Sequence, residues 1–125
     1  MTDVLLLDYN GVIVDDEPLH CEAFLTVLEE EGIALDRDEY YDDYLGLDDR
    51  ACFRQALDRD GRPIVQGDIG HLMERKGRLY LILAERGLPL VPGAADFVRA
   101  AAATARVAIV SGATHREIAL GLRQT

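Results

Sequence analysis

The sequence predicts an α/β fold in which a small parallel sheet is interrupted by an inserted bundle of helices. Two short apolar runs, at residues 4–7 and 106–110, have the length and composition of buried strands. Four successive helical patterns and then a fifth separate them. This order of elements is typical of two parallel strands that are joined by a right-handed crossover.

The first strand, Val4–Leu7, is a continuous apolar run, so we expect it to be buried on both faces. It ends at Asp8 and is followed by a turn signal at Asn10 and Gly11. A helix is then predicted to begin at Pro18 and to end at Gly32. Its apolar face comprises Leu19, Ala23, Phe24, Val27 and Leu28.

Three further helices are predicted between residues 36 and 87. The first is short and acidic and covers residues 36–45, and the second begins at Asp48 or Asp49 and ends near Gly61. Asp68 is a candidate cap for the third, in which Gly77 weakens the helical pattern. The apolar positions of these helices are Tyr40, Tyr41, Tyr44, Leu45, Phe53, Ala56, Leu57, Leu72, Tyr80 and Leu83.

The remaining elements return the chain to the sheet. Pro92 is well placed to open a helix over residues 94–103, and the second strand follows at residues 106–110. Thr114 can cap a last helix that runs to the end of the sequence. We therefore expect residues 1–14 and 88–125 to form a core, of which only the N-terminal half is present, and residues 15–87 to form a helical cap.

Composition and charge exclude several classes of protein. The chain has 125 residues, of which 49% are hydrophobic, so it has the size and composition of one globular domain. The net charge of −10 argues against a nucleic-acid or membrane partner, because either would require a basic face. Cys21 and Cys52 are too few for a disulfide framework. With no leader-like segment and no long apolar stretch, we expect a cytoplasmic protein.

Two polar residues follow the predicted strands directly. Asp8 follows the first strand and Ser111 the second, and Gly11 and Gly112 lie beside them. Because ligands of parallel sheets bind at the carboxyl ends of strands, this pair could hold a phosphate or a metal, or form an aspartyl-phosphate. In the alternative interpretation, Asp8 only ends a strand and Ser111 only caps a helix.

The motifs resemble those of the haloacid dehalogenase-like hydrolases. The segment "DYNGVIVDDEPLH" is similar to their first motif, D-x-D-G-[VT]-[LI]-x-D-[ST], and "VAIVSGATHREI" is similar to the second. The segments "YLGLDDRACFRQAL" and "RKGRLYLILAERGLPLVPGAADFVRA" resemble the helical cap of the branch that contains β-phosphoglucomutases and phosphoglycolate phosphatases. The resemblance covers essentially the whole chain and implies a Rossmann-like core.

The resemblance also implies roles for individual residues. Asp8 would be the nucleophile and a Mg²⁺ ligand, and the backbone carbonyl of Asn10 would be a second ligand. Ser111, Gly112 and Gly11 would bind the phosphoryl group of a small phosphorylated metabolite. A phosphatase or phosphomutase reaction through an aspartyl-phosphate would follow, with Mg²⁺ offsetting charge on the phosphoryl oxygens.

Four residues of the helical region are candidates for contact with substrate. They are Glu17, His20, Arg50 and Lys76. In the alternative interpretation, these are ordinary solvated residues of an acidic helical bundle, and Glu17 only favours the start of its helix.

Two departures from the family pattern bear on catalysis. Asn10 stands where the motif has an Asp that exchanges protons with the substrate, and an amide cannot take over that role. The third-motif cation and the fourth-motif acidic pair have no counterparts after the second motif. The alternatives are therefore a catalytically inactive member that binds a phospho-ligand or a protein, or a truncated fragment without independent activity. A partner chain or a further C-terminal segment would be needed to complete the sheet.

Overall fold

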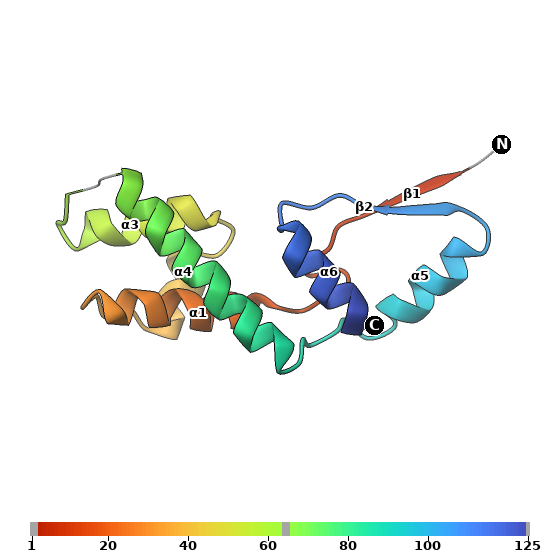
Figure 1. Ribbon diagram of the computed structural model, residues 1–125, viewed down its shortest axis with the longest axis horizontal. Coiled ribbons are helices and arrows are strands. Elements are labelled where there is room, and N and C mark those ends of the chain that lie inside the picture. The colour runs from red at the N-terminus through yellow and green to blue at the C-terminus, as the bar shows by residue number, and fades with distance from the viewer. Residues whose placement is uncertain (1–2, 64–65, 125) are drawn as a thin grey trace. The chain divides into compact units, whose positions relative to one another are not determined.

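The computed structural model describes residues 3–63 and 66–124. The chain divides into two compact units, which are Met1–Pro18 together with Ala84–Thr125 (the core unit) and Leu19–Leu83 (the cap unit). The predicted α/β architecture, a Rossmann-like parallel sheet with an inserted helical cap, is confirmed (Figure 1). In chain order the elements are β1 (Val4–Leu7), α1 (Glu17–Glu30), α2 (Arg37–Asp43), α3 (Asp49–Arg59), α4 (Gln66–Glu85), α5 (Ala94–Ala102), β2 (Arg106–Ile109) and α6 (His115–Gln124).

The sheet of the core unit pairs β1 and β2 in parallel. The register runs from Val4 opposite Arg106 to Leu7 opposite Ile109. The pairing extends beyond the last strand residue, because the Val110 N–H donates to the Leu7 carbonyl at 2.8 Å. The carboxyl ends of the two strands therefore lie side by side, as the sequence predicts.

The two faces of this sheet differ. Val4 and Leu6 are 60% and 64% exposed, whereas Leu5 and Leu7 are half-buried. The expectation that the first strand is buried on both faces is therefore wrong for the part of the chain that the structure describes. Only one face of this two-stranded sheet is covered by other described elements.

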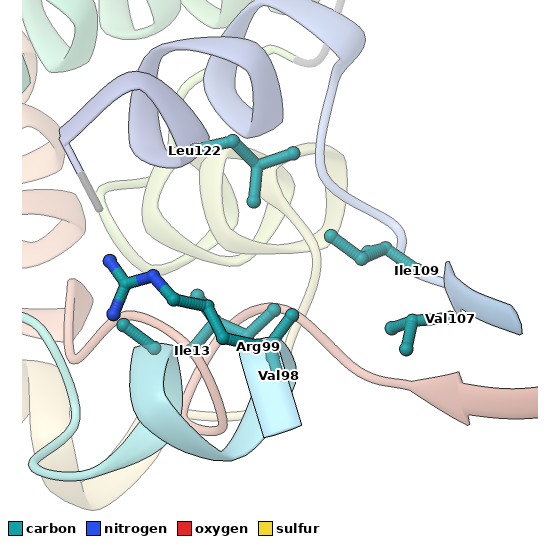
Figure 2. Close-up of a pocket in the computed structure, with 7 residues that line it drawn as sticks. Ile13, Val98, Arg99, Val107, Ile109 and Leu122 are labelled. Atoms are coloured by element: carbon teal, nitrogen blue, oxygen red, sulfur yellow. The ribbon is translucent and has the colours of Figure 1, made fainter. Parts of the chain in front are cut away.

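The covered face of the sheet borders a small apolar cavity of about 80 Å³ (Figure 2). Side chains from β2, α5 and α6 line it together with a residue of the first turn. The lining includes Val107, Ile109, Val98, Leu122 and Ile13. α5 packs against β2, and apolar side chains of α5 and α6 face this side of the sheet, as expected for helices that flank a parallel sheet.

The two segments that connect the core sequence to the inserted helices pair with each other. The Asp15 N–H donates to the Pro89 carbonyl at 2.7 Å, and the Val91 N–H donates to the Ile13 carbonyl at 3.0 Å. We call this pairing of residues 13–15 with residues 89–91 the linker ladder. It fixes the point at which the chain leaves and re-enters the core sequence.

Gln124, near the end of α6, is hydrogen-bonded to residues 84 and 88, where the chain leaves α4 and returns to the core sequence. Its side-chain amide donates to the Ala84 carbonyl and accepts from the Leu88 N–H, both at 2.7 Å. Gly87 lies between these two contacts with φ +135°, a conformation that side chains rarely adopt. The backbone around Gly87 is therefore held by a hydrogen bond on each side of this residue.

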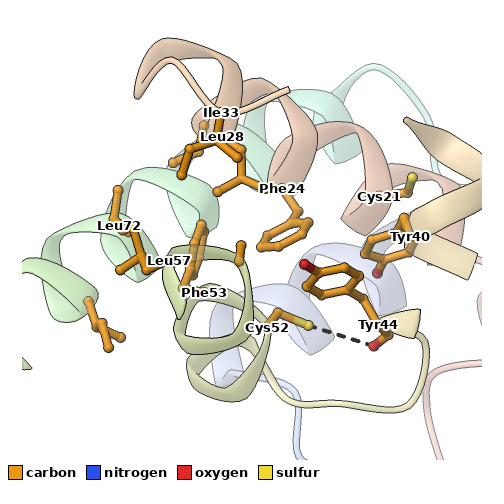
Figure 3. Close-up of a cluster of buried hydrophobic side chains, with 13 residues drawn as sticks. Cys21, Phe24, Leu28, Ile33, Tyr40, Tyr44, Cys52, Phe53, Leu57 and Leu72 are labelled. Carbon is orange, nitrogen blue, oxygen red and sulfur yellow. Dashed lines mark hydrogen bonds between the residues drawn. The ribbon is translucent and has the colours of Figure 1, made fainter. Parts of the chain in front are cut away.

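The cap unit has its own hydrophobic core, which α1, α2, α3 and α4 enclose (Figure 3). Phe24 of α1 lies at its centre, with ring centroids 4.9 Å from Phe53 and 5.5 Å from Tyr44. Aromatic pairs at these distances add about 0.5–1.5 kcal/mol each to the gain from burial. The buried members are Cys21, Phe24, Val27, Leu28, Ile33, Tyr40, Tyr44, Cys52, Phe53, Ala56, Leu57, Ile69 and Leu72.

The helix boundaries follow the predicted starts with small shifts, although Asp68, the predicted cap of α4, lies inside that helix. Asp36 and Asp48 accept from the N–H groups of Glu39 and Ala51, so both act as N-caps. α1 begins one residue before Pro18, and α4 begins before Asp68 and continues through Gly77. Both cysteines are free and buried. Within residues 3–63 and 66–124, no helix combines the length and the apolar character that crossing a membrane requires.

Candidate functional site

The candidate site lies where β1 and β2 end. Asp8 follows β1 directly and is exposed, while Ser111 follows β2 after one further residue and is half-buried. One carboxylate oxygen of Asp8 accepts from the Tyr9 N–H at 2.7 Å, and the Ser111 hydroxyl accepts from the Ala113 N–H at 3.0 Å. Each side chain is thus oriented by the turn that begins at it.

Tyr9 anchors this turn to α6. Its side chain is fully buried, and its hydroxyl donates to the Glu117 carbonyl at 3.0 Å. Burial, with added repulsion from the carboxylates of Asp16 and Glu117, raises the pKa of Tyr9 to about 12. Tyr9 is therefore a neutral hydrogen-bond donor at physiological pH. Thr114 caps α6 by accepting from the Glu117 N–H at 3.2 Å, as predicted.

Asn10 contacts residues on both sides of the turn. Its side-chain nitrogen donates to the two carboxylate oxygens of Asp16 at 3.0 and 2.9 Å, and Asp16 is only 1% exposed. Its side-chain oxygen accepts from the Ser111 hydroxyl at 3.5 Å, which is a long hydrogen bond. The structure thus brings Asn10 and Ser111 together at the strand ends, beside Asp8.

The glycines at the site have different local roles. Gly11 has φ +78°, in the left-handed region, and its N–H donates to the Val14 carbonyl at 2.7 Å. In this conformation that amide is engaged by the protein itself and does not face a ligand. Gly112 is exposed, and a Cβ added there would meet nothing within 4 Å. It therefore leaves room for a ligand beside Ser111.

The donors available for a metal ion are few but of a suitable kind. Among the described residues, no three His, Cys, Asp or Glu side chains form a group that could hold a metal ion. What the site offers is the exposed Asp8 carboxylate and the nearby backbone carbonyl of Asn10. Mg²⁺ prefers oxygen donors and commonly takes only one or two protein carboxylates, with water and phosphate oxygens completing its shell. The residues present therefore fit a partial magnesium site.

Lys76 of the cap unit is buried, in contrast to the interpretation of it as a solvated cation. Its side chain is 2% exposed, and its Nζ atom lies 2.9 Å from Asp49 and 2.5 Å from His20 Nδ1. Because an ammonium group only donates, Nδ1 must be the acceptor in this pair. The His20 ring stacks on Tyr80 at 4.3 Å. These residues form a polar cluster that joins α1, α3 and α4 of the cap unit.

The other two cap candidates lie on different helices. Arg50 is exposed near the start of α3. Glu17 is the first residue of α1, half-buried, and belongs to the core unit. Of these four candidates, the structure brings His20 and Lys76 into contact.

Sequence reasoning missed Asp16 as a member of the site. It is the middle one of three consecutive acids at residues 15–17, and composition alone does not tell which of them turns inward. Its position relative to the first motif was the available signal, because the motif has Ser or Thr there. The sequence pattern indicates Asp49, the partner of Lys76, only as a possible start of a helix.

Comparison with known proteins places the chain in a structural context. A model of the haloacid dehalogenase-like hydrolase family matches residues 2–125. No curated protein sequence matches the chain. The crystal structure of a haloacid dehalogenase hydrolase (family IA, variant 3) from Entamoeba histolytica is 21% identical, with a TM-score of 0.80 over 99% of this chain and 55% of that one.

Two further structures are also similar to the chain in fold. A mutant of CbbY from Rhodobacter sphaeroides in complex with xylulose-(1,5)-bisphosphate is 23% identical, with a TM-score of 0.82 over 99% of this chain and 57% of that one. A protein from Thermotoga maritima assigned as a β-phosphoglucomutase is 21% identical, with a TM-score of 0.70 over 99% and 56%. The chain thus spans little more than half the length of these proteins, and at this identity the likeness concerns the fold.

Proposed function

Because the chain belongs to the haloacid dehalogenase-like hydrolase family, we propose that its strand-end site acts on a small phosphorylated metabolite, as a phosphatase or phosphomutase. The observation that carries this proposal is the grouping of Asp8, Asn10 and Ser111 at the carboxyl ends of two neighbouring parallel strands. Ligands of such sheets bind at these ends.

In the proposed reaction, Asp8 is the nucleophile. Its exposed carboxylate attacks phosphorus, an acyl phosphate forms at Asp8, and the leaving group departs with the electrons of the bond that breaks. The Ser111 hydroxyl donates to an oxygen of the phosphoryl group, and the open space at Gly112 admits that group. Magnesium, held by the Asp8 carboxylate and the Asn10 carbonyl, would offset the negative charge on the phosphoryl oxygens.

Asn10 limits the second half of such a reaction. A carboxamide can accept or donate a hydrogen bond but cannot take up and return a proton, and loss of a general acid–base commonly slows a reaction about 10²–10⁴-fold. The phosphorylated Asp8 is therefore expected to form best from donors with a good leaving group and to hydrolyse slowly.

A second candidate function is binding of a phosphorylated ligand without turnover. The hydrogen bonds of the Asn10 amide to buried Asp16 favour this function. The two side chains are paired with each other, and an amide at position 10 cannot serve as a general acid. In that case the Ser111 hydroxyl would bind phosphate, and Asp8 would serve only as a ligand of Mg²⁺.

Covalent trapping separates the two functions. The protein is incubated with acetyl phosphate and Mg²⁺, and its intact mass is measured with and without EDTA. We expect one phosphoryl adduct that is sensitive to hydroxylamine, that EDTA prevents and that the D8A variant lacks. An adduct of equal yield on D8A would contradict the nucleophilic role. Absence of any adduct, together with a melting temperature that inorganic phosphate raises in the wild type but not in S111A, would establish binding alone.

A further inference from the structure

The orientation of the Asn10 carboxamide is set by Asp16. A carboxylate only accepts hydrogen bonds, so the amide nitrogen of Asn10 must face Asp16, which it contacts at 3.0 and 2.9 Å. The carboxamide oxygen is then turned toward the Ser111 hydroxyl. This assignment follows from which of these atoms can donate and which can accept a hydrogen bond. It means that the carboxamide oxygen of Asn10, and not the nitrogen, faces Ser111.

Asp16 is one of the few buried charged residues that the described part of the chain contains. It precedes α1 and is 1% exposed, and burial of a carboxylate requires hydrogen-bond donors in compensation. The motif quoted above has a carboxylate at position 10 and a hydroxyl at position 16. This chain has an amide at position 10 and a carboxylate at position 16, so donor and acceptor have changed places.

We propose that Asp16 is a positioning residue for Asn10, and that the two departures from the motif are one coupled exchange. Asp16 holds the Asn10 amide nitrogen away from the strand ends, so that Asn10 presents a carbonyl oxygen there. That oxygen can orient a hydroxyl group, either of Ser111 or of a bound phosphorylated substrate. The role of the oxygen rests on the proposed function, whereas the coupling of the two residues does not.

The coupling predicts how substitutions combine. N10D removes the N–H groups that face Asp16 and places two carboxylates against each other in a buried site. Loss of the donor and repulsion between a second carboxylate and a buried one are strongly destabilising, so we expect the melting temperature to fall by roughly 10 °C. D16S in the wild-type background should also lower it. In the N10D background, however, D16S should raise it, because the serine hydroxyl can donate to the new carboxylate.

The orientation of Asn10 can be observed directly by NMR. Asn10 is the only asparagine in the chain, so selective ¹⁵N-asparagine labelling gives a single side-chain NH₂ group. A hydrogen bond to a charged partner should slow exchange of these protons by roughly tenfold or more relative to D16S. The matched control is D15S, which removes the neighbouring exposed carboxylate and should leave exchange slow.

Each outcome bears on one of the two proposals. Slow exchange in the wild type and D15S, fast exchange in D16S, and the reversed sign of D16S in the N10D background would together support the positioning role. Fast exchange in the wild type itself, or an equal effect of D16S in both backgrounds, would overturn it. If the coupling holds but inorganic phosphate with Mg²⁺ leaves the Asn10 resonances unmoved, the proposed function fails and the pairing of Asn10 with Asp16 stands.

Discussion

Substitution of Gly121 by alanine tests how tightly α6 is docked on the turn after β1. A Cβ at this position would lie 2.8 Å from Cζ and 3.1 Å from Cε2 of Tyr9, and closer still to its hydroxyl oxygen. The Tyr9 ring cannot retreat easily, because it is fully buried and its hydroxyl donates to the Glu117 carbonyl. G121A should therefore force the helix and the turn apart.

The expected loss of stability combines one stabilising and two destabilising contributions. Alanine is favoured over glycine inside a helix by up to about 1 kcal/mol. Overpacking of a well-filled site costs about 1–3 kcal/mol, and loss of the Tyr9 hydrogen bond adds about 1 kcal/mol. The net loss is about 2 kcal/mol, which corresponds to a decrease in melting temperature of roughly 6–10 °C for a chain of this size.

The assay is thermal unfolding followed by circular dichroism, with G77A as the matched control. Gly77 is also helical, but a Cβ there would meet nothing within 4 Å, so alanine should preserve or raise the melting temperature. Y9F alone should cost about 1 kcal/mol, whereas in the G121A background it removes the closest contact and should cost nothing. A G121A protein that melts at or above the wild-type temperature would refute the reasoning, as would an equal cost of Y9F in both backgrounds.

Three other measurements test further contacts. Because burial raises the pKa of Tyr9 to about 12, the contribution of Tyr9 to stability should be fully present below about pH 10 and be lost between pH 10 and 12, since the unfolded state loses this proton first; Y9F should reduce that decrease. K76M should destabilise the cap unit by about 1–3 kcal/mol in urea unfolding, whereas R78M, two residues along α4 in an exposed ion pair, should change stability by under about 0.5 kcal/mol. Q124A should speed hydrogen exchange at the Leu88 amide, and unchanged exchange there would contradict the bracing role of Gln124.

Sequence patterns predicted the elements whose signals are local. The apolar run that ends at Asp8 gave the bounds of β1 correctly, and the predicted helix starts at Asp36 and at Asp48 or Asp49 agree with those of α2 and α3 to within one residue. The start of α1 was misplaced by one residue. The first N–H groups of a helix have no partner within it, so Pro18 is tolerated in the first turn and does not define the exact start.

Local sequence patterns could not predict features that depend on residues far apart in the chain. Lys76 has the composition of a solvated residue, and its burial arises only because α1 supplies His20 and α3 supplies Asp49. The location of Asp8 and Ser111 at the same edge of the sheet could be predicted, because strand topology alone brings the ends of parallel neighbours together. The inward turn of Asp16 could not, since it depends on the side chain of Asn10 across a tight turn.

The linker ladder affects how readily a helical cap could be exchanged between proteins of this architecture. Residues 13–15 and 89–91 are hydrogen-bonded to each other, so the inserted segment begins and ends at neighbouring points of the backbone. A short loop that joins residue 15 to residue 89 would leave this pairing and the β1–β2 pairing in place. Insertions are accepted best where the host chain needs no rearrangement to receive both ends. The ladder is therefore a natural splice point, at which a cap of another origin could be grafted or the existing cap removed.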